Sequence, residues 1–127
     1  MKDGARVGLV VDDEVHLGTL VAAVLKQMGL HTFLAHSEKD ALQIWQAHRH
    51  QIDILLTDLV MPDCRGDELA AQLISEKPGL VALFMSGNTA DMVETVVPLV
   101  LGVNFIQKPF SRNALIQLVT DLIQSPV

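Results

Sequence analysis

Residues Asp53–Pro62, with the sequence DILLTDLVMP, decide the fold and contain the first candidate functional residue. The run Ile54–Thr57 is apolar, ends in a β-branched residue and is too short for a helix, so it predicts a strand buried on both faces. Asp58 follows this strand directly. Open α/β sheets bind their ligands beyond the carboxyl ends of their strands. Asp58 is therefore our first candidate for a reacting residue.

Apolar runs on both sides of this strand predict four more strands, at Val7–Val11, His31–Ala35, Leu80–Met85 and Val103–Gln107. Helical spacing of apolar residues predicts five helices. The first ends before Gly29, the second begins at Ser37, the third ends at Pro78, the fourth covers about Ala90–Val97 and the last begins at Ser111. Strands that alternate with helices indicate an α/β domain with a parallel sheet and helices on both faces.

The composition narrows the class of protein. A chain of 127 residues predicts one domain, residues 1–127, and a net charge of -6 argues against direct binding of nucleic acid. The single Cys64 can form no internal disulfide, which is typical of a reducing compartment. The sequence has neither a signal peptide nor an apolar run long enough to span a membrane, so we expect a cytoplasmic domain with no membrane partner. Only Ser125–Val127 follow the last helix, so we expect no DNA-binding output motif in this chain, which is either a stand-alone regulator or a piece of a longer protein.

Chemistry-bearing residues follow four of the five predicted strands. Asp12 and Asp13 follow the first, Asp58 the third, Ser86 the fourth and Lys108 the fifth. Because carboxyl ends of parallel strands share one edge, we expect these side chains to meet in one crevice. Each alone has an ordinary interpretation as a helix cap, a turn residue or a solvated strand end. Their convergence is the functional signal.

Three crowded carboxylates, those of Asp12, Asp13 and Asp58, need positive charge. Two carboxylates about 4 Å apart repel by about 4 kcal/mol at an effective dielectric constant near 20, so one would otherwise take up a proton. Mg²⁺ prefers such oxygen ligands and keeps several waters. With Lys108 neutralising phosphoryl oxygens, Asp58 could attack phosphorus and become an acyl phosphate.

From about Val7 to Ile123 the chain resembles the receiver domains of two-component response regulators, the superfamily of the chemotaxis receivers. The resemblance rests on four motifs in this order: Asp12-Asp13, Asp58-Leu59-Val60-Met61-Pro62 with Gly66, Met85-Ser86-Gly87, and Lys108-Pro109-Phe110. It implies a flavodoxin-like (βα)5 three-layer sandwich with a five-stranded parallel sheet of order 2-1-3-4-5. The motifs around Ser86 and Lys108 also look like those of receivers in hybrid sensor histidine kinases.

The resemblance implies a phosphoacceptor and a metal site. Asp58 resembles the residue that accepts the phosphoryl group. Asp13 resembles the direct Mg²⁺ ligand, Asp12 a ligand that acts largely through water, and the backbone carbonyl of Val60 a third protein ligand. Lys108 resembles the residue that pairs with Asp58 or with its phosphoryl group.

The resemblance also implies a switch. Ser86 resembles the hydroxyl that swings toward the phosphoryl group, and Phe105 occupies the position of the aromatic residue that then moves inward. Lys108-Pro109 resembles the family's cis peptide. Val60 and Asn88 stand where the family tunes loss of the phosphoryl group. An aliphatic Val60 should orient no attacking water, which predicts slow self-hydrolysis.

The implied partners are a histidine kinase or histidine phosphotransfer protein as donor, and a downstream protein or fused domain as receiver of the signal. The signal would pass through the surface of the fourth helix, the fifth strand and the last helix, and the domain would not be a turnover enzyme. One alternative is a pseudo-receiver, an interaction module that is not phosphorylated. Another is an aspartate-nucleophile phosphatase of the haloacid dehalogenase type, which would need an acid where Val60 stands.

Two further features have open interpretations. The fourth helix and the segment after it are more apolar than one buried stripe requires, at Met92, Val93, Val96, Val97, Leu99, Val100 and Leu101. These residues either pack locally or form an exposed patch for a partner. Cys64 lies near Asp58 in the sequence but is better explained as an ordinary small residue.

Overall fold

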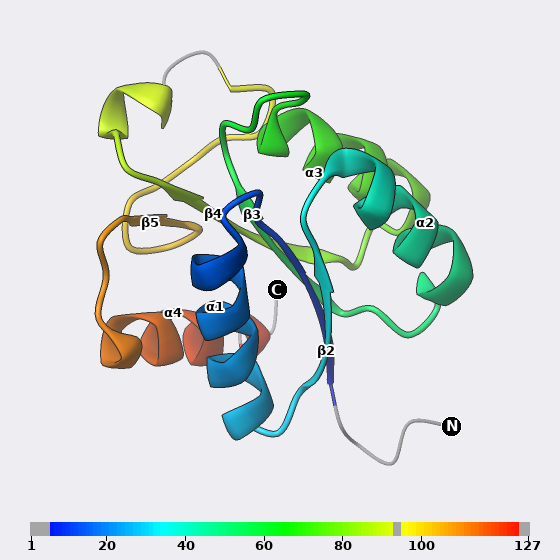
Figure 1. Ribbon diagram of the computed structural model, residues 1–127, viewed down its shortest axis with the longest axis horizontal. Helices are drawn as coiled ribbons and strands as arrows, with labels where there is room; N and C mark the ends of the chain where they lie inside the picture. Colours follow the sequence, from blue (N-terminus) through cyan, green and yellow to red (C-terminus); the bar gives the residue numbers. More distant parts are fainter. Residues whose placement is uncertain (1–5, 93–94, 125–127) are drawn as a thin grey trace.

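Five parallel strands form one sheet in the order β2-β1-β3-β4-β5 (Figure 1). The computed structural model describes residues 6–92 and 95–124. The strands are β1 Val7–Val11, β2 His31–Ala35, β3 Ile54–Asp58, β4 Val81–Ser86 and β5 Phe105–Gln107. The helices are α1 Val15–Gln27, α2 Glu38–His48, α3 Gly66–Glu76, the short 3₁₀ helix η1 Thr89–Met92 and α4 Arg112–Gln124. The flavodoxin-like fold and its strand order are confirmed.

Helices cover both faces of the sheet, α1 and α4 on one side and α2 and α3 on the other (Figure 1). The alternation of side chains along a strand divides the core accordingly. Leu9 of β1 points into the cluster that contains Trp45 of α2, and Val10 points into the cluster that contains Leu25 of α1. All five residues of β1 and of β3 are buried, as expected for the inner strands of a doubly covered sheet.

Local signals set several element ends as predicted. β1 and β2 have the predicted bounds. The Ser37 hydroxyl accepts the N–H of Asp40 at 3.1 Å, which caps α2. The Ser111 hydroxyl accepts the N–H of Ala114 at 3.0 Å at the start of α4. β3 runs one residue further than predicted, so that Asp58 is itself the last residue of the strand.

The prediction of a fourth helix over about Ala90–Val97 was wrong. Of the residues described in this range, only Thr89–Met92 are helical, as η1, and residues 95–100 are not helical. The residues described in this structure therefore form four α-helices, and α4 is the helix that the sequence predicted as the fifth. β-branched residues and Pro98 make a poor helix, and the Asp67 carboxylate accepts the N–H of Val96 at 2.9 Å. Residues 93 and 94 of the predicted helix lie outside the described residues.

Candidate functional site

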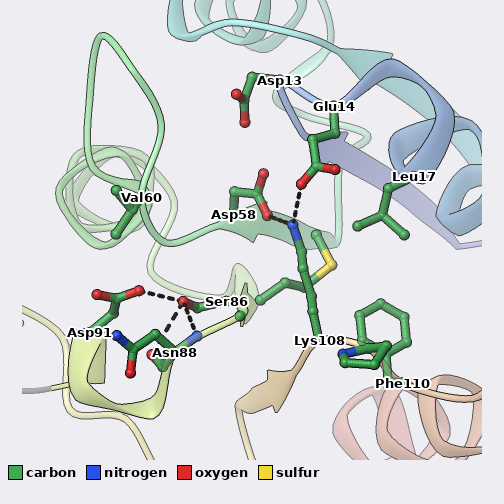
Figure 2. Close-up of a pocket in the computed structure, with 13 residues that line it drawn as sticks. Asp13, Glu14, Leu17, Asp58, Val60, Ser86, Asn88, Asp91, Lys108 and Phe110 are labelled. Atoms are coloured by element: carbon green, nitrogen blue, oxygen red, sulfur yellow. Dashed lines mark hydrogen bonds and ion pairs between the residues drawn. The ribbon is translucent and has the colours of Figure 1, made fainter.

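A pocket of about 660 Å³ opens at the carboxyl ends of the strands (Figure 2). The predicted residues Asp13, Asp58, Val60, Ser86 and Lys108 line it. They come from the loop after β1, the end of β3, the loop after it, the end of β4 and the residue after β5. The parallel sheet thus gathers at one edge residues that lie far apart in the sequence, as the strand pattern predicted.

Three carboxylates form the acidic cluster of this site. Asp12, Asp13 and Asp58 each offer an oxygen atom, and these atoms lie within 4.8 Å of one another. Asp12 is fully buried, Asp58 is 3 % exposed and Asp13 is exposed. Asp12 Oδ1 accepts the N–H of Glu14 at 2.8 Å, but Asp12 Oδ2 is buried and has no hydrogen-bond partner among the described residues. A buried oxygen in that state is costly unless a donor or a cation satisfies it.

Lys108 is the cation that faces this cluster. Its ammonium group donates a hydrogen bond to Asp58 Oδ1 and lies 3.7 Å from Asp12 Oδ2. It also lies 3.5 Å from Glu14 Oε1, a contact that we did not predict although Glu14 continues the acidic run after β1. The peptide bond between Lys108 and Pro109 is cis, and the Lys108 N–H donates to the Ser86 carbonyl at 2.8 Å.

One ammonium group does not balance these carboxylates. Burial and the neighbouring Asp12 carboxylate raise the pKa of Asp58 to about 8, although Lys108 opposes this shift. Burial by itself lowers the pKa of Lys108, but the hydrogen bond and charge of Asp58 raise that pKa above its usual value. The site therefore favours an additional positive charge.

The donor set fits a hard divalent cation. All three acids of the cluster supply carboxylate oxygens, the ligand type that Mg²⁺ prefers, and the buried Asp12 Oδ2 has no hydrogen-bond donor among the described residues, with Lys108 Nζ 3.7 Å away. The cluster could therefore hold a metal ion. Val60 lines the same pocket, and its backbone carbonyl remains a predicted ligand.

Ser86 has partners that the sequence did not indicate. Its hydroxyl donates to Asp91 Oδ2 at 2.5 Å and accepts the N–H of Asn88 at 3.2 Å (Figure 2). Asp91 lies on η1 and lines the same pocket as Asp58. No sequence motif singles out Asp91, because the contact depends on the 3₁₀ turn that replaces the predicted helix.

Phe105, the predicted switch residue, lies outside the pocket. It is fully buried and pairs with Phe84 across β4 and β5. The buried core cluster that contains both residues also extends to Val97 and Leu99, which pack against it. The structure thus connects Phe105 to the segment that follows η1.

Two other predicted features have mixed outcomes. Val97 and Leu99 pack on the core, which confirms local packing for part of the apolar segment, whereas Val96, Val100 and Leu101 are 60 %, 53 % and 56 % exposed, and a partner for them stays a prediction. Val93 and the side chain of Met92 lie outside the described part. Burial, followed by nearby acids, raises the pKa of Cys64 to about 11, which favours its interpretation as an ordinary residue.

Comparisons with known proteins show the family of this chain. The family model for the response regulator receiver domain matches residues 9–120. The sensor kinase CckA of Brucella abortus is 30 % identical over 95 % of this chain, which spans 13 % of that protein. The probable transcriptional regulator ycf29 of Pyropia yezoensis is 25 % identical over 94 % of this chain, which spans 54 % of it. The chain thus covers between about an eighth and about half of the length of these relatives.

Solved structures are similar over nearly the whole chain. The crystal structure of the receiver domain of the hybrid histidine kinase CckA superposes with a TM-score of 0.76 and 26 % identity, covering 93 % of this chain and 99 % of that one. Among the described residues, no helix is both long enough and apolar enough to cross a membrane.

Proposed function

Because this chain belongs to the response regulator receiver family, whose domain matches residues 9–120, we propose that it accepts a phosphoryl group on Asp58. The observation that carries the proposal is the acidic cluster, in which Asp58 lies beside a buried Asp12 oxygen without a donor and contacts the ammonium group of Lys108. A histidine kinase or a histidine phosphotransfer protein would be the donor. The similarity to a sensor kinase supports this class of partner.

In the proposed transfer, a carboxylate oxygen of Asp58 attacks the phosphorus of a phosphohistidine. A P–O bond forms, the P–N bond breaks, and the donor imidazole leaves with the electron pair. Only the ionised carboxylate is a nucleophile, and burial together with the neighbouring Asp12 carboxylate raises the pKa of Asp58, which disfavours that ionised form without a metal. Mg²⁺ held by Asp12, Asp13, Asp58 and the Val60 carbonyl would supply positive charge for the ionised acids and for the phosphoryl oxygens.

Lys108 would supply a second positive charge beside Asp58. Its ammonium group already contacts Asp58 Oδ1, so it can move to a phosphoryl oxygen by a small rotation. Ser86 lines the same pocket and would offer its hydroxyl to another phosphoryl oxygen. Val60 is half exposed beside the pocket and aliphatic, so it would orient no water, and we expect slow loss of the phosphoryl group.

The output surface of this proposal comprises the segment after η1, β5 and α4. Phosphorylation would bias a two-state equilibrium of this surface, with Phe105 as the buried aromatic residue of the core cluster on which Val97 and Leu99 pack. Exposed Val96, Val100 and Leu101 lie on this segment and offer apolar area to a downstream protein or a fused domain.

The test uses acetyl phosphate and Mg²⁺ with intact-mass spectrometry of the wild type, Asp58→Asn and Asp63→Asn. We expect an adduct of one phosphoryl group on the wild type and on Asp63→Asn, the matched control in the exposed loop after β3, and none on Asp58→Asn. An adduct on Asp58→Asn would assign the acceptor elsewhere. No adduct on any of the three proteins would indicate an interaction module that is not phosphorylated.

A further inference from the structure

The Ser86 hydroxyl is held by Asp91. A hydroxyl group has one proton to donate, and the short contact of 2.5 Å to Asp91 Oδ2 takes it in preference to the Asn88 carbonyl at 3.3 Å. Hydrogen bonds to a carboxylate are about twice as strong as neutral ones. The lone pairs of the same hydroxyl accept the N–H of Asn88 at 3.2 Å. Ser86 is therefore engaged on the η1 side of the pocket (Figure 2).

The position of Asp91 is fixed by the turn that carries it. The Asp91 N–H donates to the Asn88 carbonyl at 3.0 Å, and the Ala90 N–H donates to Asn88 Oδ1 at 2.9 Å. These contacts close the loop from β4 into η1, so that the Asp91 carboxylate faces back to the end of β4. Within residues 6–92 and 95–124, no ion pair binds Asp91, so its carboxylate remains available to Ser86.

We propose that Asp91 is a positioning residue that holds the Ser86 hydroxyl away from Asp58 until a phosphoryl group competes for it. The inference rests on the proposed function. Ser86 has one proton, so it cannot donate to Asp91 Oδ2 and to a phosphoryl oxygen on Asp58 at the same time. When Ser86 turns to the phosphoryl group, one charge-assisted hydrogen bond therefore replaces another, and Asp91 on η1 loses its contact with Ser86. The strength of the Asp91 contact sets how readily the phosphorylated state is reached.

The test is a double-mutant cycle between Asp91→Ala and Ser86→Ala. The ligand is beryllofluoride with Mg²⁺, a mimic of the phosphoryl group on Asp58, and its dissociation constant is measured by calorimetry. We expect Asp91→Ala to tighten binding by about 5- to 30-fold, because Ser86 no longer has to leave a charged acceptor. In the Ser86→Ala background, Asp91→Ala should change binding by less than about 2-fold.

A simple charge effect predicts a different pattern. Removal of an acid near an anion site tightens anion binding whether or not Ser86 is present, so equal tightening in both backgrounds would overturn the proposal. Asp91→Asn further separates the charge effect from the loss of the acceptor for Ser86, because this substitution removes the charge but keeps an acceptor. We expect Asn to tighten binding less than Ala does, and equal effects of the two substitutions would overturn the proposal.

The metal-free protein gives a second readout. The Asn88 N–H is bonded to the Ser86 hydroxyl, so its amide resonance should move in Asp91→Ala and stay close to its wild-type position in Asp91→Asn. An Asn88 resonance that moves equally in both variants would contradict the proposal. If Asp91→Ala does not fold, binding by Asp91→Asn must still be tighter than wild type and depend on Ser86.

Failure of this inference is distinguishable from failure of the proposed function. If the wild type binds no beryllofluoride in Mg²⁺, the phosphoacceptor function is wrong, and the Asn88 resonance alone decides whether Asp91 holds Ser86. If the wild type binds and Asp91→Ala binds equally well, Asp91 has no positioning role although the function stands.

Discussion

Gly66 and Asp58 approach so closely that a methyl group on Gly66 would lie 1.9 Å from the backbone carbonyl oxygen of Asp58. The Gly66 N–H also donates to the Leu59 carbonyl at 2.8 Å, which fixes the start of α3 against the end of β3. Any Cβ at this position must displace the backbone that carries Asp58. The glycine eight residues after the acid therefore belongs to the site as well as to the fold.

We predict that Gly66→Ala lowers the free energy of unfolding by about 3 kcal/mol, measured by urea denaturation. The matched control is Gly79→Ala, because a Cβ on Gly79 would meet nothing within 4 Å. We expect that change to stay within about 1 kcal/mol of wild type. Equal stability of the two variants would show that the backbone near Asp58 can move to accommodate a Cβ on Gly66 without loss of stability.

The raised pKa of Asp58 predicts how stability depends on pH without metal. Between about pH 4 and pH 8 the folded state binds more protons at Asp58 than the unfolded state does, so this carboxyl group makes the protein less stable as pH rises through that window. Mg²⁺ should raise Tm, and by more at pH 8 than at pH 5, because the metal favours the ionised acids.

Thermal unfolding with Mg²⁺ and with a chelator checks this at both pH values, in the wild type and in Asp58→Asn. The difference in pH dependence of Tm between wild type and Asp58→Asn gives the contribution of Asp58 apart from the other acids of the chain. If the metal-free wild type and Asp58→Asn show the same dependence on pH, Asp58 has no raised pKa.

Lys108 should have opposite effects on metal binding and on phosphorylation. Its ammonium group contacts Asp58 and lies 3.7 Å from Asp12 Oδ2, so it repels a cation at the acidic cluster. We predict that Lys108→Met binds Mg²⁺ several-fold more tightly, yet reacts with acetyl phosphate about 100-fold more slowly because a phosphoryl oxygen loses its cationic partner. Lys26→Met, at an exposed position in the last turn of α1, should change neither the affinity for Mg²⁺ nor the rate of reaction with acetyl phosphate. Weaker Mg²⁺ binding by Lys108→Met would contradict the expected competition.

Asp67 should hold the segment after η1 in place. This acid is 1 % exposed, its Oδ2 accepts the N–H of Val96 at 2.9 Å, and its Oδ1 accepts Arg65 Nε at 3.0 Å. Asp67→Ala leaves both donors without this partner, so we predict a loss of about 2–3 kcal/mol in the free energy of unfolding. Amide exchange at Val96 should also become faster than in the wild type. Glu68→Ala is the control, since Glu68 is exposed in the same turn, and unchanged exchange at Val96 in Asp67→Ala would contradict the prediction.

The sequence by itself indicated all five strands, although β4 begins one residue and β5 two residues later than predicted, and the sheet edge at which the candidate residues meet. Apolar runs such as Val7–Val11 mark strands because a doubly covered parallel sheet buries both faces of its inner strands. The chemistry-bearing residues after these runs then had to meet, since parallel strands end at one edge. The family motifs supplied the strand order, which the periodicity alone does not specify.

Only the tertiary structure decided the state of the segment after β4 and the hydrogen bonding of the site. The Val96 N–H donates to Asp67, 29 residues earlier in the sequence, and the Lys108 ammonium group donates to Asp58, 50 residues earlier. Local spacing predicted a helix where the Val96 N–H instead finds the distant Asp67, and it gave no sign of the bond between Ser86 and Asp91. Periodicity reports which side chains avoid water, whereas the partner of a particular donor is set by which elements the fold brings within 3 Å or so of each other.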